Sequence, residues 1–231
     1  MQTKTVVSLT LAALAIAGCG SSKDNKSSTS AAAGSTAPAQ SAPQTSATAC
    51  KKVSAPSTGA RKAKKPRQKL DPGKTYTITM QTNCGSFSFD LDVKTSPKGS
   101  ASFDSLAKKG FFDKTIFHRI VPDFVIQGGD PTAGGTGGPG YKTVDKPSPS
   151  QDYPKGTVAM AKAGNESPGT AGSQFFVVTS DQGGAQLTPD YAVVGHVTKG
   201  MDVVDKIAAL GSPTEQPTQV VEIEKATVSE K

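Results

Sequence analysis

Short segments in which apolar and polar residues alternate fill the chain from about residue 75 onward, and they constrain the fold more than any other feature. Tyr76, Ile78 and Met80 share one face of the first segment, and a turn at 83–85 leads into a second at 87–91. This pattern predicts a β-hairpin. Many short strands favour a β-sandwich or a β-barrel, and periodicity does not choose between them. Further strands are predicted at 115–121, 124–128, 157–161, 174–179, 191–197 and 219–228.

Only two helices are expected. Ser96 and Pro97 are residue types favoured at a helix N-cap and first helical position, and Gly110 ends the apolar pattern that follows. A second helix fits residues 201–210. No internal repeat is visible, so residues 70–231 are predicted to form one domain.

Two of the predicted strands carry polar side chains among large apolar ones. Arg119 and Gln127 lie within FHRIVPDFVIQGGD at 117–130, and Gln174 lies within AGSQFFVV at 171–178. A polar donor inside an apolar strand needs a partner or a purpose. A cleft that grips an apolar group while presenting a guanidinium would supply that purpose.

These segments closely resemble the cyclophilin family of peptidyl-prolyl isomerases. The resemblance runs from about residue 74 to 228. It implies a mainly β fold, an eight-stranded antiparallel closed β-barrel capped by two α-helices, and prolyl isomerase activity that uses no cofactor and no metal. It rests on FHRIVPDFVIQGGD, GTGGPGY at 135–141, MA at 160–161, GSQFF at 172–176, YAVVGHV at 191–197 and KGMDVVDKI at 199–207.

The resemblance also implies the site. Rotation about a prolyl amide crosses a barrier of roughly 18–20 kcal/mol, and a donor aimed at the prolyl nitrogen lowers it in the twisted state. Arg119 matches the family's catalytic arginine. Residues implied to act with it in catalysis are Gln127, Phe124 and Phe176. Residues implied to contact the peptide are His118, Val125, Ala161, Lys162, Ala163, Gln174, Leu187 and Tyr191.

Some positions depart from the family pattern. Gln186 stands where many eukaryotic members carry Trp, and Tyr191 stands where they carry His. These departures argue against tight binding of cyclosporin. They leave the arginine and the two phenylalanines intact.

The first residues have the features of an export signal. Lys4 precedes an apolar run at 6–17 that is too short to span a bilayer comfortably, and the run ends in Gly18-Cys19. We expect a lipoprotein signal peptide at 1–18 and a lipidated Cys19, such as a palmitoylated one, that holds the protein on the extracytoplasmic side of a bacterial cell membrane. The alternative is an ordinary secretory signal with an accidental Cys.

Residues 19–69 are expected to be a disordered linker, because their Ser, Ala, Thr and Pro content offers little apolar surface to bury. Residues 51–69 carry eight basic and no acidic residues, whereas the 15 basic and 18 acidic residues after them give a net charge of −3. The net charge of +7 therefore does not indicate a nucleic-acid-binding domain. The basic segment could adhere to anionic lipid or wall polymer, or it could be a solvated linker.

The remaining cysteines, Cys50 and Cys84, could pair in an oxidising compartment or stay free. The spacing of the two histidines and these cysteines offers no metal site. The glycine run at 134–140 lacks the Gly-Lys-Ser/Thr of a phosphate-binding loop.

We therefore expect a monomeric isomerase that acts on X-Pro bonds of exported proteins and assists their folding. The alternative is a tethered, non-catalytic module, or chaperone, that binds proline peptides.

Overall fold

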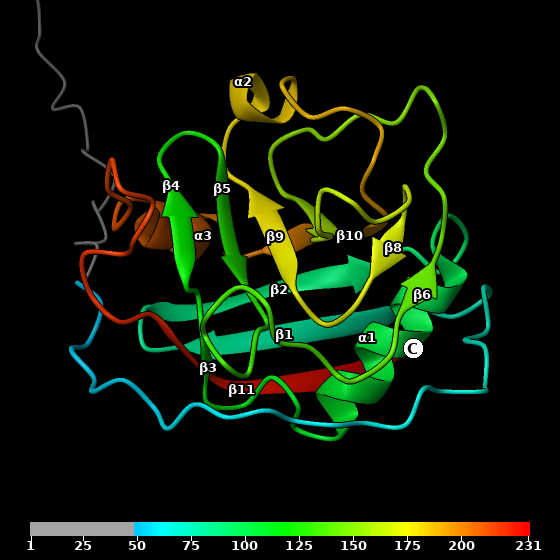
Figure 1. Ribbon diagram of the computed structural model, residues 1–231, viewed down its shortest axis with the longest axis horizontal. Helices are drawn as coiled ribbons and strands as arrows, with labels where there is room; N and C mark the ends of the chain where they lie inside the picture. Colours follow the sequence, from blue (N-terminus) through cyan, green and yellow to red (C-terminus); the bar gives the residue numbers. More distant parts are fainter. Residues whose placement is uncertain (1–48) are drawn as a thin grey trace, which may run out of the picture. The chain divides into compact units, whose positions relative to one another are not determined.

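The structure is a computed structural model that describes residues 49–231 (Figure 1). The expected signal peptide at 1–18, the lipidated Cys19 and the linker over 19–48 lie outside the described residues. The strands are β1 (Tyr76–Thr82), β2 (Gly85–Leu91), β3 (Thr115–Ile116), β4 (Arg119–Val121), β5 (Val125–Gly128), β6 (Thr143–Val144), β7 (Thr157–Met160), β8 (Thr170–Ala171), β9 (Phe175–Val178), β10 (Val193–Lys199) and β11 (Glu222–Glu230). The helices are α1 (Pro97–Lys108), α2 (Asp181–Gly184) and α3 (Met201–Ala208).

Nine strands form one antiparallel sheet in the order β3-β11-β1-β2-β10-β7-β9-β5-β4, and β6 pairs with β8. This curled sheet is open, so the expected closed eight-stranded barrel is wrong. The two edge strands, β3 and β4, follow each other in the chain and are separated only by Phe117 and His118. They share no ladder, and a single isolated bridge from Ile116 to Asp130 lies near the gap.

The predicted hairpin and both predicted helices are present. β1 and β2 pair around the turn at 83–84, and α1 begins at Pro97 as expected. The strand expected at 115–121 is divided into β3 and β4. α2, β6 and β8 were not predicted, because two to four residues are too few to show a period.

Two apolar clusters lie on opposite faces of β9. Phe175 is fully buried, and its ring centroid lies 5.3 Å from that of Phe103 in the main core. Phe176 belongs to a second cluster with Val125, Tyr153 and other buried residues. Because successive side chains of a strand point to opposite faces, β9 serves the core with one phenylalanine and the second cluster with the other.

Residues 49–70, here called the N-terminal strap, lie along the folded domain and are the blue-to-cyan trace in Figure 1. A disulfide joins Cys50 to Cys84, with an S–S distance of 2.09 Å. Lys51 N–H donates to the carbonyl of Asn83 at 2.9 Å. The disordered linker expected over 51–69 is thus replaced by an ordered, extended segment. Its polar composition did not indicate this, because the contacts are made largely by backbone groups that every residue carries.

In the part of the chain from 49 onward, none of the helices combines the length and the apolar character that crossing a bilayer would require.

Candidate active site

The register of three neighbouring strands brings the central polar and aromatic side chains together. Arg119 of β4 lies opposite Gln127 of β5, and Gln127 lies opposite Phe176 of β9. Residues directly opposite each other in an antiparallel pair project to the same face at about 5 Å. Arg119, Gln127 and Phe176, which are all predicted site residues, therefore lie in one row across the sheet.

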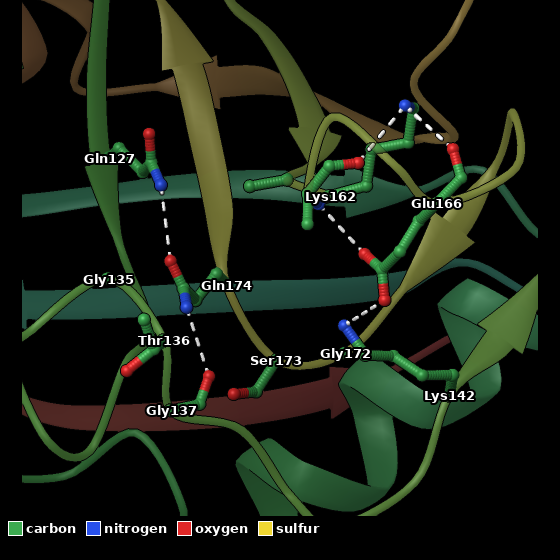
Figure 2. A pocket seen from close by; sticks show the side chains of 12 residues that line it. Gln127, Gly135, Thr136, Gly137, Lys142, Lys162, Glu166, Gly172, Ser173 and Gln174 are labelled. Atoms are coloured by element: carbon green, nitrogen blue, oxygen red, sulfur yellow. Dashed lines mark hydrogen bonds and ion pairs between the residues drawn. The ribbon is translucent and has the colours of Figure 1, made fainter.

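A chain of hydrogen bonds fixes the polar side chains of this row. Arg119 Nη1 donates to Gln127 Oε1 at 3.3 Å, and Gln127 Nε2 donates to Gln174 Oε1 at 3.2 Å. Gln174 Nε2 donates in turn to the carbonyl of Gly137 at 3.0 Å, as Figure 2 shows. The Gln127 amide therefore accepts from the guanidinium and donates to Gln174, which sets its orientation.

Arg119 has a second partner that sequence reasoning missed. Its Nε donates to Glu215 Oε2 at 2.7 Å, and the side chains of Arg119 and Glu215 are 32% and 48% exposed. The carbonyl of Glu215 accepts from Ile120 N–H at 2.9 Å, which ties the 211–219 loop to β4. The hydrogen bond and the positive charge of Arg119 lower the pKa of Glu215. No local pattern links residues 96 positions apart, so the sequence held no signal for this pair.

Arg119 lines a cavity of about 250 Å³, here called the Arg119 cavity. Apolar side chains from the second cluster form much of its wall, and the Phe176 ring meets the Tyr191 ring edge-on at 5.3 Å between centroids. A permanently charged side chain therefore lines the same cavity as six apolar or aromatic residues. The lining residues are Arg119, Phe124, Val125, Gln127, Ala161, Lys162, Phe176, Leu187 and Tyr191.

Two contacts hold one side of this cavity. Tyr191 N–H donates to the Tyr153 hydroxyl at 3.0 Å, and that hydroxyl donates to the Tyr191 carbonyl at 2.9 Å. The Lys162 side chain is only 4% exposed and its Nζ lies 2.6 Å from Asp190 Oδ2. A buried lysine needs an anionic partner, and Asp190, the residue before Tyr191, supplies it. The lysine at 162 was therefore a signal in the sequence for an acidic partner.

Figure 2 shows the residues that line a second cavity of about 320 Å³, here called the Gln174 cavity. This cavity shares Gln127, Ala161 and Lys162 with the Arg119 cavity and therefore adjoins it. Lys142 Nζ lies 2.8 Å from Glu166 Oε1 across this cavity, and the bond from Lys142 is the main cause that lowers the pKa of Glu166. Its remaining lining residues are Gly135, Thr136, Gly137, Lys142, Ala163, Glu166, Gly172, Ser173 and Gln174.

His118 and Ala163 lie apart from the Arg119 cavity. Ala163 lines the Gln174 cavity instead. His118 is 8% exposed, and a Cβ placed on Gly135 would lie 4.0 Å from its Nε2. Neither ring nitrogen has a hydrogen-bond partner among the described residues. Burial lowers the pKa of His118, although the nearby Asp130 carboxylate opposes the shift, so the neutral imidazole is favoured at pH 7.

Residues 49–231 contain no group of three or more His, Cys, Asp or Glu side chains that could hold a metal ion.

Comparison with known proteins decides the family. The family model described as cyclophilin type peptidyl-prolyl cis-trans isomerase/CLD matches residues 77–228. The chain belongs to the cyclophilin family. This cyclophilin is therefore a peptidyl-prolyl cis-trans isomerase, as its curated relatives are named.

Relatives come from fungi, plants and bacteria. Peptidyl-prolyl cis-trans isomerase-like 1 of Gibberella zeae is 37% identical over 161 residues, which are 68% of this chain and 96% of that protein. Probable peptidyl-prolyl cis-trans isomerase A of Mycobacterium leprae is 36% identical over 172 residues, which are 66% and 92% of the two chains. This breadth supports the enzyme class and does not distinguish a lipoprotein form.

Among solved structures, a cyclophilin type peptidyl-prolyl cis-trans isomerase of Cryptosporidium parvum matches with a TM-score of 0.61 and 30% identity. The match covers 67% of this chain and 98% of that one. The same protein crystallised in the presence of the dipeptide Ala-Pro matches with a TM-score of 0.60.

Proposed function

We propose that the Arg119 cavity is the catalytic site and that Arg119 is its catalytic residue. One observation carries the proposal: Arg119, both predicted phenylalanines and Gln127 line the same cavity. The apolar walls would hold a proline ring out of water. The guanidinium would donate to the prolyl nitrogen, whose lone pair is available only when the amide is twisted, and so would act on the transition state more than on the ground state.

The protonation chemistry of this step is simple. No bond to the substrate is made or broken, so the step requires no nucleophile, and the guanidinium stays charged throughout. Gln127 would act as a positioning residue, because its amide oxygen accepts from Arg119 Nη1. Phe124, Val125, Phe176 and Leu187 would contact the proline ring.

A test compares Arg119→Ala with the wild-type full chain in a proline isomerisation assay on a short X-Pro peptide. We expect kcat/KM to fall at least about a hundredfold, since the lost donor acts mainly in the transition state. Arg67→Ala is the matched control, because Arg67 is an exposed arginine far from the cavity in sequence, and it should retain wild-type kcat/KM. Equal turnover of Arg119→Ala and wild type at the uncatalysed rate would favour the non-catalytic proline-binding module.

We propose further that the substrates are proline-containing segments of exported proteins and that the isomerase assists their folding at the cell surface as a monomer. The apolar run before Gly18-Cys19 supports export and lipidation. The Cys19→Ser variant tests the anchor: the protein should move from the membrane fraction to the soluble fraction. Retention of Cys19→Ser on the membrane would contradict the lipid anchor.

A further inference from the structure

We propose that the N-terminal strap is a positioning element of the substrate-binding site. It would hold the segment at 131–142, here called the glycine loop, as one wall of the Gln174 cavity. The inference rests on the isomerase function of the adjoining Arg119 cavity. It gives a role to a segment that lies outside residues 77–228, the part matched by the family model.

Three hydrogen bonds join the strap to the glycine loop, one at the start of the loop and two near its end. Gly59 N–H donates to the carbonyl of Pro131 at 3.0 Å, where the loop begins. Ala63 N–H donates to the carbonyl of Pro139 at 2.9 Å. Near the end of the loop, Lys65 Nζ donates to the carbonyl of Lys142 at 2.8 Å. The strap thus contacts the loop at spaced points along its length.

The interior of the loop has a different support. The Asp130 carboxylate accepts from Thr132 N–H and Thr132 Oγ1, both at 2.7 Å, and from Gly137 N–H at 3.0 Å. Burial alone would raise the pKa of Asp130, but these bonds outweigh it and lower the pKa, so the carboxylate stays ionised. Asp130 therefore organises the first half of the loop, and its hydrogen bonds within the described chain do not extend to Pro139 or Lys142.

The composition of the loop explains why it needs further support. Gly135 and Gly140 have φ angles of +80° and +86°, and glycine-rich backbone loses much conformational entropy when it is ordered. Lys142 carries the ion pair with Glu166, so the position of its backbone affects the charged side of the cavity. A backbone held by the strap would keep this wall in place before a peptide binds, which improves affinity by preorganisation.

The strap can position the loop because the strap itself is fixed to other parts of the domain. Its start is bound by the disulfide to Cys84, and Asn83 Nδ2 donates to the Lys51 carbonyl at 2.6 Å. Farther along, Arg61 Nη1 donates to the carbonyls of Phe111 and Asp113 at 2.6 and 2.7 Å. The strap therefore links the β1–β2 turn and the segment after α1 to the glycine loop.

The two cavities are contiguous, so a peptide with its proline in the Arg119 cavity can place a flanking residue in the Gln174 cavity. Loss of the strap contact should therefore weaken the binding only of peptides that are long enough to reach the Gln174 cavity. Short X-Pro peptides confined to the Arg119 cavity should bind and react as before. Unequal effects on long and short peptides separate a positioning role from general destabilisation.

The experiment uses the full chain with Ala63→Pro, which removes the N–H that binds Pro139. Ala63→Ser, which keeps that N–H, is the matched control. For a peptide of six or more residues with a central proline, we expect Ala63→Pro to raise KM, and the Kd measured by calorimetry, about three- to tenfold, the effect of one lost hydrogen bond. The kcat, all constants for a short X-Pro peptide, and Ala63→Ser should stay at wild-type values. Gly59→Pro removes the other backbone donor and should give the same pattern.

Unchanged KM and Kd for the long peptide in both proline variants, or equal losses for long and short peptides, would overturn the proposal. Because Kd is measured without turnover, an inactive wild-type protein would count against the catalytic role of Arg119 and would still allow the strap to be tested. Thermal unfolding of each variant verifies that the comparison is made on folded protein.

Discussion

At the scale of single residues, the catalytic proposal depends on how the donors of one guanidinium are divided. Arginine has five N–H donors in a fixed fork. In Arg119, Nε donates to Glu215 and Nη1 donates to Gln127, so two of its three nitrogens are held, and the residue lines the Arg119 cavity. The family resemblance implies that Gln127 acts with Arg119, and the structure adds Glu215 as a second partner.

We expect Glu215→Gln to lower kcat roughly twofold to fivefold at pH 7, because the guanidinium loses a charged partner that orients it. The Tm should change little, since exposed ion pairs contribute little to stability. The pKa of Glu215 is lowered from 4.5, so the pair is intact at neutral pH and breaks only as pH falls below that value. The wild-type kcat should therefore decline toward that of the variant in acid.

Steady-state kinetics from pH 3 to 8 measure this effect. Glu224→Gln is the matched control, because Glu224 is an exposed glutamate and no side-chain partner is seen for it within the described chain. If Glu215→Gln and wild type had the same kcat at every pH, Glu215 would have no positioning role.

At the scale of elements, β9 shows how one strand can serve both stability and the site. Phe175 packs among the rings of Phe103, Phe112 and Phe117, with centroid distances of 5.3 to 5.9 Å. Phe176 lies on the other face, beside Tyr191 in the Arg119 cavity. The period of two in a strand assigns adjacent residues of the same type to different roles.

Alanine substitutions should separate these roles. Phe175→Ala should reduce the free energy of unfolding by about 3–5 kcal/mol, the cost of a cavity in a packed aromatic core. Phe176→Ala should lower kcat/KM by more than about tenfold at a smaller loss of stability, because its ring borders an existing cavity. Guanidinium denaturation and steady-state kinetics on both variants measure the two quantities. A larger loss of stability in Phe176→Ala than in Phe175→Ala would contradict this division.

At the scale of the whole molecule, the folded unit begins at the disulfide rather than at residue 70. The sheet is open between β3 and β4, and the strap runs outside it from the β1–β2 turn toward the glycine loop. The basic residues of the strap therefore lie on the domain itself. The eight basic residues at 51–69, which were expected to belong to a linker, are part of the surface of the enzyme.

The Cys50–Cys84 disulfide closes a loop of 34 residues in sequence separation. The chain-entropy relation for a loop of this length gives a stabilisation of about 4 kcal/mol as an upper value. We expect the Cys50→Ala, Cys84→Ala double variant to lose up to about this free energy of unfolding while keeping its activity on short peptides. Denaturant titration measures the loss, and an unchanged midpoint would show that the disulfide adds no stability.

Much of the site was predictable because its signals are local. Arg119, Gln127 and Phe176 match short motifs of the family pattern, and the structure brings all three residues to the Arg119 cavity. His118, which the family resemblance implies to contact the peptide, is not among the residues that line the Arg119 cavity. The Glu215 partner and the Lys142–Glu166 pair were not predicted, because loops with no periodicity bring these charges together.

The sequence by itself determined the family, the hairpin, the two longer helices and the row of side chains at the site, since period and residue chemistry act over a few neighbouring positions. Only the tertiary structure decided that the sheet stays open, that Cys50 pairs with Cys84 and that residues 51–69 lie on the domain. These outcomes depend on backbone hydrogen bonds and on contacts between residues far apart in the chain. Backbone groups are the same in every residue, so a sequence pattern carries almost no record of which carbonyl a given N–H will find.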